Sequence, residues 1–383
     1  MKNLILHHTL FFLISAQQIF GNVEFSTPEV DNENIEDVYL RAPNFSDENI
    51  SGFNVGLRPY RKSGIRLETE IMEGKILIHN YGYGGSGLTL SLGGAHEVLS
   101  ILEQEKINNP QFESTQCVAI LGAGVIGLAT AYELMNRGYT VNIYAENFSP
   151  NLTSNVAAGI WSPPVSENEN QQKLIKKMLE ISNQRFKACI SSAHPEFAGV
   201  RMLTCYSFKK LGNSNVDLTN KFQESLTEKR IVRVHFDNGI IKIGKRKQEL
   251  GLDGKIFMDD LYAKIVSKGA KIYSKKFSNI DDVVSLSEKI IINCTSLGSR
   301  NLFNDQDFAP VRGHLVYFQP QKGVDYMLYQ NIPEDSNYWF SIYPWNDRLI
   351  LGGVFENGME KLQIDSTVTN KLIKNGKDFF KEN

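Results

Sequence analysis

The fold is decided by the stretch Cys117-Val118-Ala119-Ile120-Leu121-Gly122-Ala123-Gly124-Val125-Ile126-Gly127. Its first five residues predict a buried strand, and the apolar periodicity beyond the glycines predicts a helix that ends near Arg137. A further strand is expected over residues 140–145. A strand, a glycine-rich turn and a helix in this order predict a Rossmann-like unit, in which the helix N-terminus holds the pyrophosphate of a dinucleotide.

The position of Glu146 supports this interpretation. Glu146 closes the second strand, 24 residues after Gly122. At about this distance an acidic residue binds the ribose of such a cofactor. Two other interpretations stay open, because glycines also form tight packing turns and a solvated surface acid is common at the end of a strand.

The composition is that of a globular protein with a small-molecule partner. The chain has 41 Lys and Arg against 43 Asp and Glu and no basic block, so neither a nucleic acid nor a membrane surface is expected as a partner. The cysteines have no metal-ligand spacing, which predicts no metal site and no disulfide framework. They are Cys117, Cys189, Cys205 and Cys294. Cys117 and Cys294 lie in apolar strand patterns and are expected as buried thiols.

The first residues have the pattern of a secretory signal peptide. A charged start, Met1-Lys2-Asn3, precedes a short apolar run over residues 4–16. The run is too short to span a membrane, which needs roughly 20 residues. We therefore expect residues 1–21 to be a signal peptide and the protein to be a secreted, extracellular glycoprotein, with Asn44 and Asn49 as glycan acceptors. The alternative is a frayed apolar N-terminus.

The rest of the chain combines two kinds of pattern. Residues 24–49 are polar and are expected as a loop. Strands and helices of a parallel α/β layer are predicted at residues 75–80, 88–106, 258–268, 271–277 and 289–295, with a glycine-rich turn at residues 81–87. Aromatic and β-branched segments predict a separate sheet at residues 201–209, 230–243, 313–319 and 338–355. The predicted fold class is α/β, with a Rossmann-like domain and a second domain built on a mixed, largely antiparallel sheet.

A family resemblance adds to these patterns. Residues 151–161, together with residues 118–134 and 144–150, resemble the amino-terminal FAD-binding region of the D-amino-acid oxidase and D-aspartate oxidase family. The resemblance continues through residues 290–296, 312–313, 342–344 and 351–353.

The order of the matching segments is rotated relative to the family. The family's carboxy-terminal part is matched at the front of this chain, by residues 55–61, 64–68 and 78–89. Each family segment occurs once, so the resemblance implies a circularly permuted chain. The alternative is a gene model that joins parts of two neighbouring copies.

The resemblance implies an interleaved domain organisation. An FAD-binding domain is expected at residues 117–165 and 255–306, completed by residues 56–107 from the front. A linker at residues 108–116 joins the two parts, and at up to roughly 3.3 Å per residue it is long enough to do so without strain. A substrate domain is expected at residues 22–55, 166–254 and 307–383.

The resemblance also implies which residues contact FAD. From the amino-terminal pattern these are Gly122, Ala123, Gly124, Val125, Ile126, Gly127, Glu146, Thr153, Ser154, Ala158, Gly159, Trp161 and Phe277. From the front segment they are Gly85, Ser86, Gly87, Leu88 and Thr89. A glycine-rich turn at a helix start can present N–H groups to a carbonyl oxygen of the flavin, although a plain strand-to-helix turn is the alternative for this second set.

Arg58 matches the arginine with which the family binds the α-carboxylate of its substrate. A guanidinium can hold a carboxylate by two parallel hydrogen bonds, which orients the substrate's Cα–H bond. An arginine in a surface ion pair is the alternative. Gly85, Ser341 and Tyr343 are also expected to bind the substrate.

Two positions depart from the family pattern. Ser341 replaces a tyrosine, so Tyr338 or Tyr343 would have to supply a substituting hydroxyl. Phe355 stands where D-aspartate oxidases carry an arginine. An acidic substrate would then need a second cation from elsewhere, and the candidates are Arg61, His314 and Arg348; the alternative for each is a surface charge.

The resemblance implies an FAD-dependent oxidase that uses O2. Its expected reaction is oxidative deamination of acidic D-amino acids, D-aspartate and D-glutamate, to a 2-oxo acid, ammonia and hydrogen peroxide. The implied chemistry is hydride transfer to the flavin, so no catalytic side chain is expected. The alternatives are an oxidase of neutral D-amino acids or of glycine-like amines, and a non-catalytic flavin-binding relative.

Overall fold

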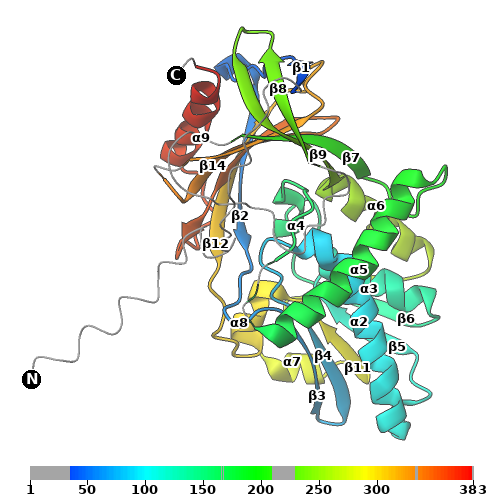
Figure 1. Cartoon of the computed structure of the whole chain (residues 1–383). Helices are drawn as coiled ribbons and strands as arrows, with labels where there is room; N and C mark the ends of the chain where they lie inside the picture. The colour runs from blue at the N-terminus through cyan, green and yellow to red at the C-terminus, as the bar shows by residue number, and fades with distance from the viewer. Residues whose placement is uncertain (1–34, 165, 167, 209–228, 333–334, 382–383) are drawn as a thin grey trace, which may run out of the picture.

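The computed structural model describes residues 35–164, 166, 168–208, 229–332 and 335–381. Within these residues the chain forms two β-sheets, one of ten strands and one of six (Figure 1). The expected signal peptide, residues 1–21, lies outside the described residues. No helix of the described part has both the length and the apolar character needed to cross a membrane.

The six-stranded sheet is the dinucleotide-binding layer. Its order is β10 (Lys271–Ser274), β6 (Thr140–Ala145), β5 (Cys117–Leu121), β11 (Ile290–Asn293), β4 (Lys75–Tyr81) and β3 (Arg66–Met72). All neighbours are parallel except β3, which is the antiparallel edge strand. Every residue of β4 is buried, as expected for an inner strand that helices or loops cover on both faces. A segment from the front of the chain therefore forms an internal strand of this sheet.

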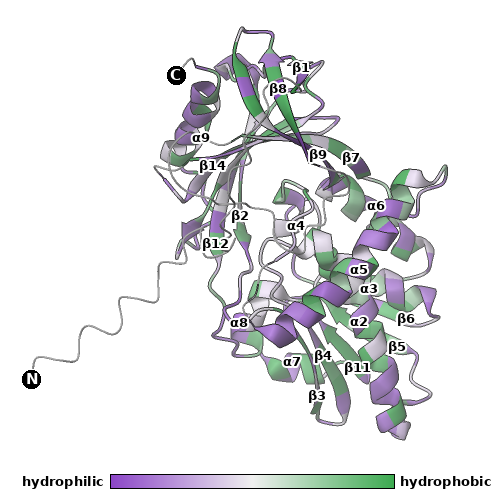
Figure 2. Cartoon of the chain, in the orientation of Figure 1, coloured by the Kyte–Doolittle hydropathy of each residue, from purple (hydrophilic) through white to green (hydrophobic). Residues whose placement is uncertain are grey.

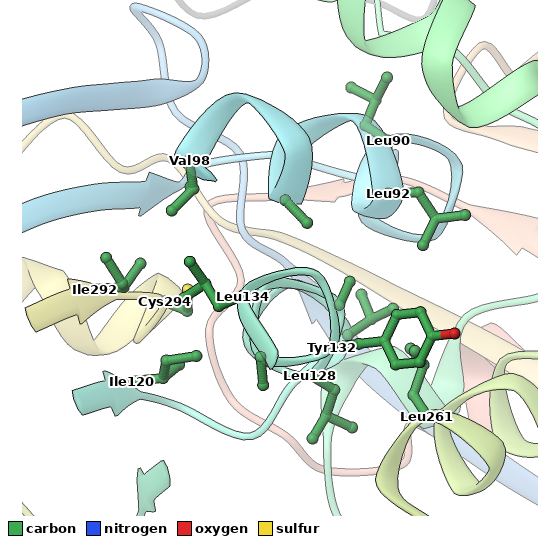
Figure 3. Packing of buried hydrophobic residues seen from close by; sticks show 14 of the residues in the cluster. Leu90, Leu92, Val98, Ile120, Leu128, Tyr132, Leu134, Leu261, Ile292 and Cys294 are labelled. Atoms are coloured by element: carbon green, nitrogen blue, oxygen red, sulfur yellow. The ribbon is translucent and has the colours of Figure 1, made fainter. Parts of the chain in front are cut away.

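Four helices belong to this layer. They are α2 (Gly87–Asn108), α3 (Val125–Asn136), α5 (Glu169–Ser191) and α6 (Gly254–Ser267). α2 packs on α3 and α5, and α3 packs on α6. Figure 3 shows their common core, in which Val98 of α2 and Leu134 of α3 lie close to Ile292 of β11. These three side chains are fully buried.

The ten-stranded sheet is mixed. Its order is β1 (Glu36–Leu40), β8 (Arg230–Phe236), β9 (Ile241–Leu252), β7 (Val200–Phe208), β13 (Met327–Asn331), β14 (Tyr338–Pro344), β15 (Leu349–Val354), β12 (Val311–Phe318) and β16 (Glu356–Asn357), with β2 (Ile50–Arg58) paired to β12. Only β1 with β8 and β7 with β13 are parallel. Helix α9 (Ser366–Phe379) covers one face. It buries Leu372 and Phe379 against the sheet and turns its polar face outward (Figure 2).

Several short helices complete the chain between these elements. They are η2 (Asp47–Asn49), η3 (Pro110–Phe112), α4 (Thr153–Val156), α7 (Ile280–Val284), η4 (Ser296–Gly298) and α8 (Ser299–Leu302). η3 lies in the predicted linker, where Lys106 Nζ donates to the carbonyl oxygen of Thr115 at 2.9 Å.

The elements around the glycine motif have the predicted bounds, whereas others differ. Residues 24–49 are not all loop, because β1 pairs with β8 and η2 precedes β2. The helix predicted at residues 258–268 starts at Gly254, since the Asp253 carboxylate accepts from Lys255 N and Ile256 N and caps it. The strand predicted at residues 271–277 ends at Ser274, where its pairing with β6 ends.

Two elements differ from the predicted domain division. α5 lies within residues 166–254, which were assigned to the substrate domain, yet it packs on α2 and joins the core of the six-stranded layer. β2 continues in the ten-stranded sheet to Arg58, past the predicted boundary at residue 56. All four cysteines are free thiols; Cys294 is buried as predicted, whereas Cys117 is only partly buried.

Candidate active site

A cavity of about 2170 Å³ lies between the two sheets. Ordinary small-ligand sites measure roughly 300–1,000 Å³, so this one has room for an extended cofactor together with a substrate. Its lining includes both glycine-rich segments, although one comes from residues 122–124 and the other from residues 82–87. The parallel order of β5, β11 and β4 brings their carboxyl ends, and hence both segments, to the same edge of the sheet.

The first glycine segment is shaped for a close approach from the cavity. Gly122 has a φ of +105°, and a Cβ there would lie 2.5 Å from the Cys294 carbonyl oxygen. A Cβ on Gly127 would lie 2.0 Å from the Gly122 carbonyl oxygen, so this glycine allows α3 to pack on the turn. A Cβ on Gly124 would meet only Ser154 Oγ, at 3.6 Å. The open space at Gly124, in front of the N-terminus of α3, is the place where a pyrophosphate fits.

Most of the predicted FAD residues line this cavity. Besides Gly122 and Gly124 they are Ala123, Val125, Ile126, Glu146, Thr153, Ser154, Ala158, Gly159, Trp161, Phe277, Gly85, Ser86, Gly87 and Leu88. Glu146 follows β6 and forms an exposed ion pair with Lys276 at 2.9 Å. Exposed pairs contribute little free energy, so this pair leaves the carboxylate available to a ribose.

Two predicted FAD residues, Gly127 and Thr89, do not line the cavity. Gly127 acts through packing, as described above. Thr89 is buried, and its Oγ1 accepts from Ser162 N at 2.9 Å. This hydrogen bond connects the start of α2 to the segment that follows Gly159. Thr89 therefore stabilises the fold next to the cavity and does not line it.

Arg58 ends β2 and lines the cavity. Its Nη1 donates to the Val354 carbonyl oxygen at 3.1 Å, and its guanidinium lies 4.7 Å from the centre of the Phe355 ring. Burial lowers the pKa of Arg58 to about 10, so it is charged at neutral pH. The nearby acid Glu356 pairs instead with Arg312 and His314, each at 2.7 Å. The part of the chain that the structure describes therefore contains no carboxylate in an ion pair with Arg58, and its remaining N–H groups suit an anionic ligand.

The structure separates the two predicted substrate residues of β14. Tyr343 lines the cavity, whereas Ser341 does not. Ser341 is fully buried and its Oγ donates to the Gly352 carbonyl oxygen at 2.9 Å. Burial raises the pKa of the Tyr343 hydroxyl, which also interacts with the side chains of Ser341 and Trp339. Tyr343 is thus one of two tyrosine hydroxyls of this strand that line the cavity, and Tyr338 is the other.

Trp339 and Tyr329 are among the aromatic residues of the lining that sequence reasoning missed. Trp339 lies on the same face of β14 as Tyr343, and Tyr329 of β13 is paired with Ser341. Alternation along β14 from Tyr343 could have indicated Trp339. Tyr329 had no comparable signal, because β13 was not predicted.

Each cation that was considered for a second carboxylate has an acidic partner. Arg61 Nε lies 2.8 Å from Asp305 Oδ2. His314 Nδ1 lies 2.7 Å from Glu356 Oε2. Arg348 Nη2 lies 3.2 Å from Asp253 Oδ1. Of the three, only Arg61 lines the cavity.

The parallel sheet, the glycine turn at the start of α3 and the large shared cavity define a dinucleotide-dependent class of enzyme. The profile of the family described as "DAO: FAD dependent oxidoreductase" matches residues 117–383. The chain therefore belongs to this FAD-dependent oxidoreductase family, and FAD is its cofactor. The cavity fits FAD, because the glycine segments leave room where a side chain would intrude.

The similarity of this chain to known proteins agrees with the family assignment. A D-amino acid oxidase of Dugesia ryukyuensis is 29% identical over 210 residues, which cover 52% of this chain and 60% of that protein. The D-aspartate oxidase of Homo sapiens is 28% identical over 272 residues, or 68% and 74% of the two chains. The crystal structure of an iminodiacetate oxidase from Chelativorans sp. BNC1 has the same fold, with a TM-score of 0.50 and 15% identity over 68% of this chain and 77% of that one.

Proposed function

We propose that this protein oxidises D-amino acids. The overall reaction converts a D-amino acid, O2 and water into a 2-oxo acid, ammonia and hydrogen peroxide. The observation that carries the proposal is Arg58, a guanidinium in the cofactor cavity with no acidic partner among the described residues. An unpaired arginine of this kind suits the α-carboxylate that every amino acid substrate carries.

The residues of the chain position and enclose the substrate. Arg58 binds the α-carboxylate and thereby orients the Cα–H bond, which is the positional contribution to catalysis. Gly85 lies against the Arg58 side chain, where a Cβ would be 3.5 Å from its Cδ, so this glycine keeps the approach to the arginine open. When bound, FAD supplies the two-electron oxidant for the Cα–N bond. No side chain is needed as a base in this proposal.

The notion that the enzyme prefers acidic D-amino acids, D-aspartate and D-glutamate, is a more specific proposal with support on both sides. The loop sequence around Arg58 and the similarity to a D-aspartate oxidase support it. The pairing of Arg61, His314 and Arg348 with acids supports the neutral alternative instead.

The purified protein is expected to contain FAD and to release hydrogen peroxide with D-amino acids but not with their L-enantiomers. The physical reason is that a substrate whose carboxylate is held by Arg58 and whose side chain is held by the cavity wall can turn its Cα–H bond toward the cofactor in only one enantiomer. The measurement is peroxide release across matched D- and L-amino acid panels, with glycine and sarcosine as amine controls. Flavin-loaded protein that is silent with every D-amino acid would rule the oxidase proposal out.

We further propose that the circularly permuted order is that of the real protein. Three observations support it. β4 and α2, from the front of the chain, complete the six-stranded layer, while the family profile starts at residue 117. The end of α9 also lies beside residues near the start of the described part of the chain, where the rings of Phe45 and Phe380 are 6.2 Å apart and Lys377 lies 3.5 Å from Asp47. In a chain with the family's segment order, the end of α9 would be connected directly to the segment that contains Phe45 and Asp47.

The permuted protein is expected to yield a tryptic peptide of residues 107–137, which contains no internal Lys or Arg and crosses the junction before β5. Mass spectrometry of the protein from its natural source tests this directly. A second test joins residue 381 to residue 35 through a glycine-serine linker and opens the chain between residues 113 and 116. This reordered chain should bind FAD like the original, because it keeps β1 and the buried Phe112 and changes only connections outside the described helices and strands.

An artefactual gene model predicts the opposite results. The junction peptide would be missing while peptides on both sides of it are found. As a control for the reordered chain, an opening at Ser100, in the middle of α2, should prevent folding, since α2 packs on both α3 and α5.

A further inference from the structure

A third turn borders the cavity, between the two glycine segments. It follows β11, and the cavity lining includes all of its residues, which are Cys294, Thr295, Ser296, Leu297 and Gly298. β11 lies between β5 and β4 and runs parallel to both, at roughly 4.8 Å from each. The carboxyl ends of the three strands therefore place this turn beside the first glycine segment on one side and the second glycine segment, residues 82–87, on the other.

Close backbone contacts join this turn to the first glycine segment. Cys294 N donates to the Leu121 carbonyl oxygen at 2.9 Å, and a Cβ on Gly122 would lie 2.5 Å from the Cys294 carbonyl oxygen. The two turns thus form one continuous part of the cavity wall. A cofactor with its pyrophosphate at the first glycine segment and its flavin at the second would pass this turn with the ribitol chain that links them.

Ser296 has a backbone conformation that favours glycine. Its φ is +55°, in the left-handed region that few L-residues adopt. Among the described non-glycine residues, Glu73 and Asn304 also have a positive φ, but neither lines the cavity. Glu73 lies in the exposed two-residue turn between β3 and β4, where this conformation is usual, and asparagine tolerates it. Within the described residues, Ser296 alone combines such a backbone with a position on the cavity wall.

A buried network holds this turn in place. Asn293 Oδ1 accepts from Thr295 N at 3.0 Å and from Thr295 Oγ1 at 2.7 Å. Asn293 Nδ2 donates to Ser299 Oγ at 3.1 Å and lies 3.0 Å from His79 Nδ1. Burial lowers the pKa of His79 to about 4, so the ring is neutral at neutral pH and its Nδ1 can accept from Asn293. The network therefore uses the Thr295 hydroxyl within the protein and presents Ser296 to the cavity from a fixed backbone.

We infer that Ser296 binds FAD, and that its hydroxyl donates a hydrogen bond to an oxygen of the chain between the pyrophosphate and the flavin. Glycine would adopt the backbone conformation of residue 296 without strain, so a serine there destabilises the turn unless its side chain contributes elsewhere. Residues held in such conformations cluster at ligand sites. The inference concerns the cofactor alone and does not depend on the proposed oxidase activity.

Ser296→Gly is expected to have opposite effects on the apoprotein and on cofactor binding. It relieves the backbone strain, so the Tm of the apoprotein should rise by about 1–3 °C. It also removes the hydroxyl, so the dissociation constant of FAD should rise about three- to tenfold. Thermal unfolding followed by circular dichroism measures the first effect. Titration of FAD into the apoprotein, followed by flavin fluorescence, measures the second, and neither measurement requires turnover.

Two further variants separate the backbone from the hydroxyl. Ser296→Ala removes the hydroxyl but keeps the strained backbone, so it should weaken FAD binding by the same factor without raising the Tm. Glu73→Gly is the matched control: it relieves a positive φ of 46° away from the cavity lining and should leave the dissociation constant of FAD unchanged. If Ser296→Ala or Ser296→Gly binds FAD as tightly as the unmodified chain, the inference is wrong.

Discussion

Gly124→Val is expected to abolish FAD binding while leaving the protein folded. The backbone at Gly124 has φ −72° and ψ 176°, which valine adopts readily. Within the protein the new Cβ would meet only Ser154 Oγ, at 3.6 Å. The valine side chain would instead occupy the space in front of the N-terminus of α3, where the pyrophosphate is expected. The measurement is the flavin absorbance of the purified variant.

A thermal unfolding experiment separates loss of cofactor from loss of fold. A ligand that binds only the folded state raises its stability, so added FAD should raise the Tm of the unmodified apoprotein but not that of Gly124→Val. Gly52→Val is the control, because a Cβ at Gly52 in β2 has no neighbour within 4 Å and Gly52 does not line the cavity. Retention of a full complement of flavin by Gly124→Val would refute the assignment of this turn to the pyrophosphate.

Arg58→Ala is expected to lower kcat/KM for the best D-amino acid by roughly 30-fold or more, with FAD still bound. Truncating one member of a hydrogen-bonded charge pair costs about 2–5 kcal/mol, and about 1.4 kcal/mol corresponds to a tenfold loss. The proposed partner of Arg58 is the substrate alone, since its protein contacts are the carbonyl oxygens of Val354 and Arg312 and the ring of Phe355. Steady-state peroxide assays with a flavin spectrum of the same sample measure both effects.

Two further variants define the role of Arg58. Arg58→Lys should recover only part of the activity, because an ammonium keeps the charge but cannot form two parallel hydrogen bonds. Arg137→Ala is the surface control: Arg137 pairs with Glu103 at the exposed end of α3, and its loss should not change kcat/KM. Undiminished activity in Arg58→Ala, or loss of flavin from it, would exclude the proposed role.

The sequence allowed the six-stranded layer to be predicted more accurately than the other sheet. β5 and β6 have the predicted bounds. β5 is a continuous apolar run, as expected for a strand that helices cover on both faces, and β6 alternates between buried and more exposed residues. β1 was expected as loop, since three of its five residues are exposed and only pairing with β8 stabilises it as a strand. β1 begins with two acids, Glu36 and Asp37, inside a polar stretch, so the short apolar run 38–40 gave no clear strand signal.

The sequence also indicated most of the cofactor site, but it did not resolve the substrate site. The glycine motif could be assigned because its spacing reflects local backbone geometry, which a short segment determines by itself. The cations were a different case. Arg61, His314 and Arg348 were equal candidates for a second carboxylate, and each turned out to have an acidic partner.

By itself, the sequence determined the dinucleotide-binding unit and the cofactor class, and it identified Arg58 as a candidate for binding the substrate's α-carboxylate. Only the tertiary structure decided that Arg58 lacks an acidic partner within the described residues, that Ser341 faces the backbone, and that Phe355 lies on Arg58. The physical reason is distance along the chain. A glycine turn depends on neighbouring residues, whereas the Arg58 site combines β2 with strands nearly 300 residues later, as in the hydrogen bond between residues 58 and 354, which are 296 positions apart.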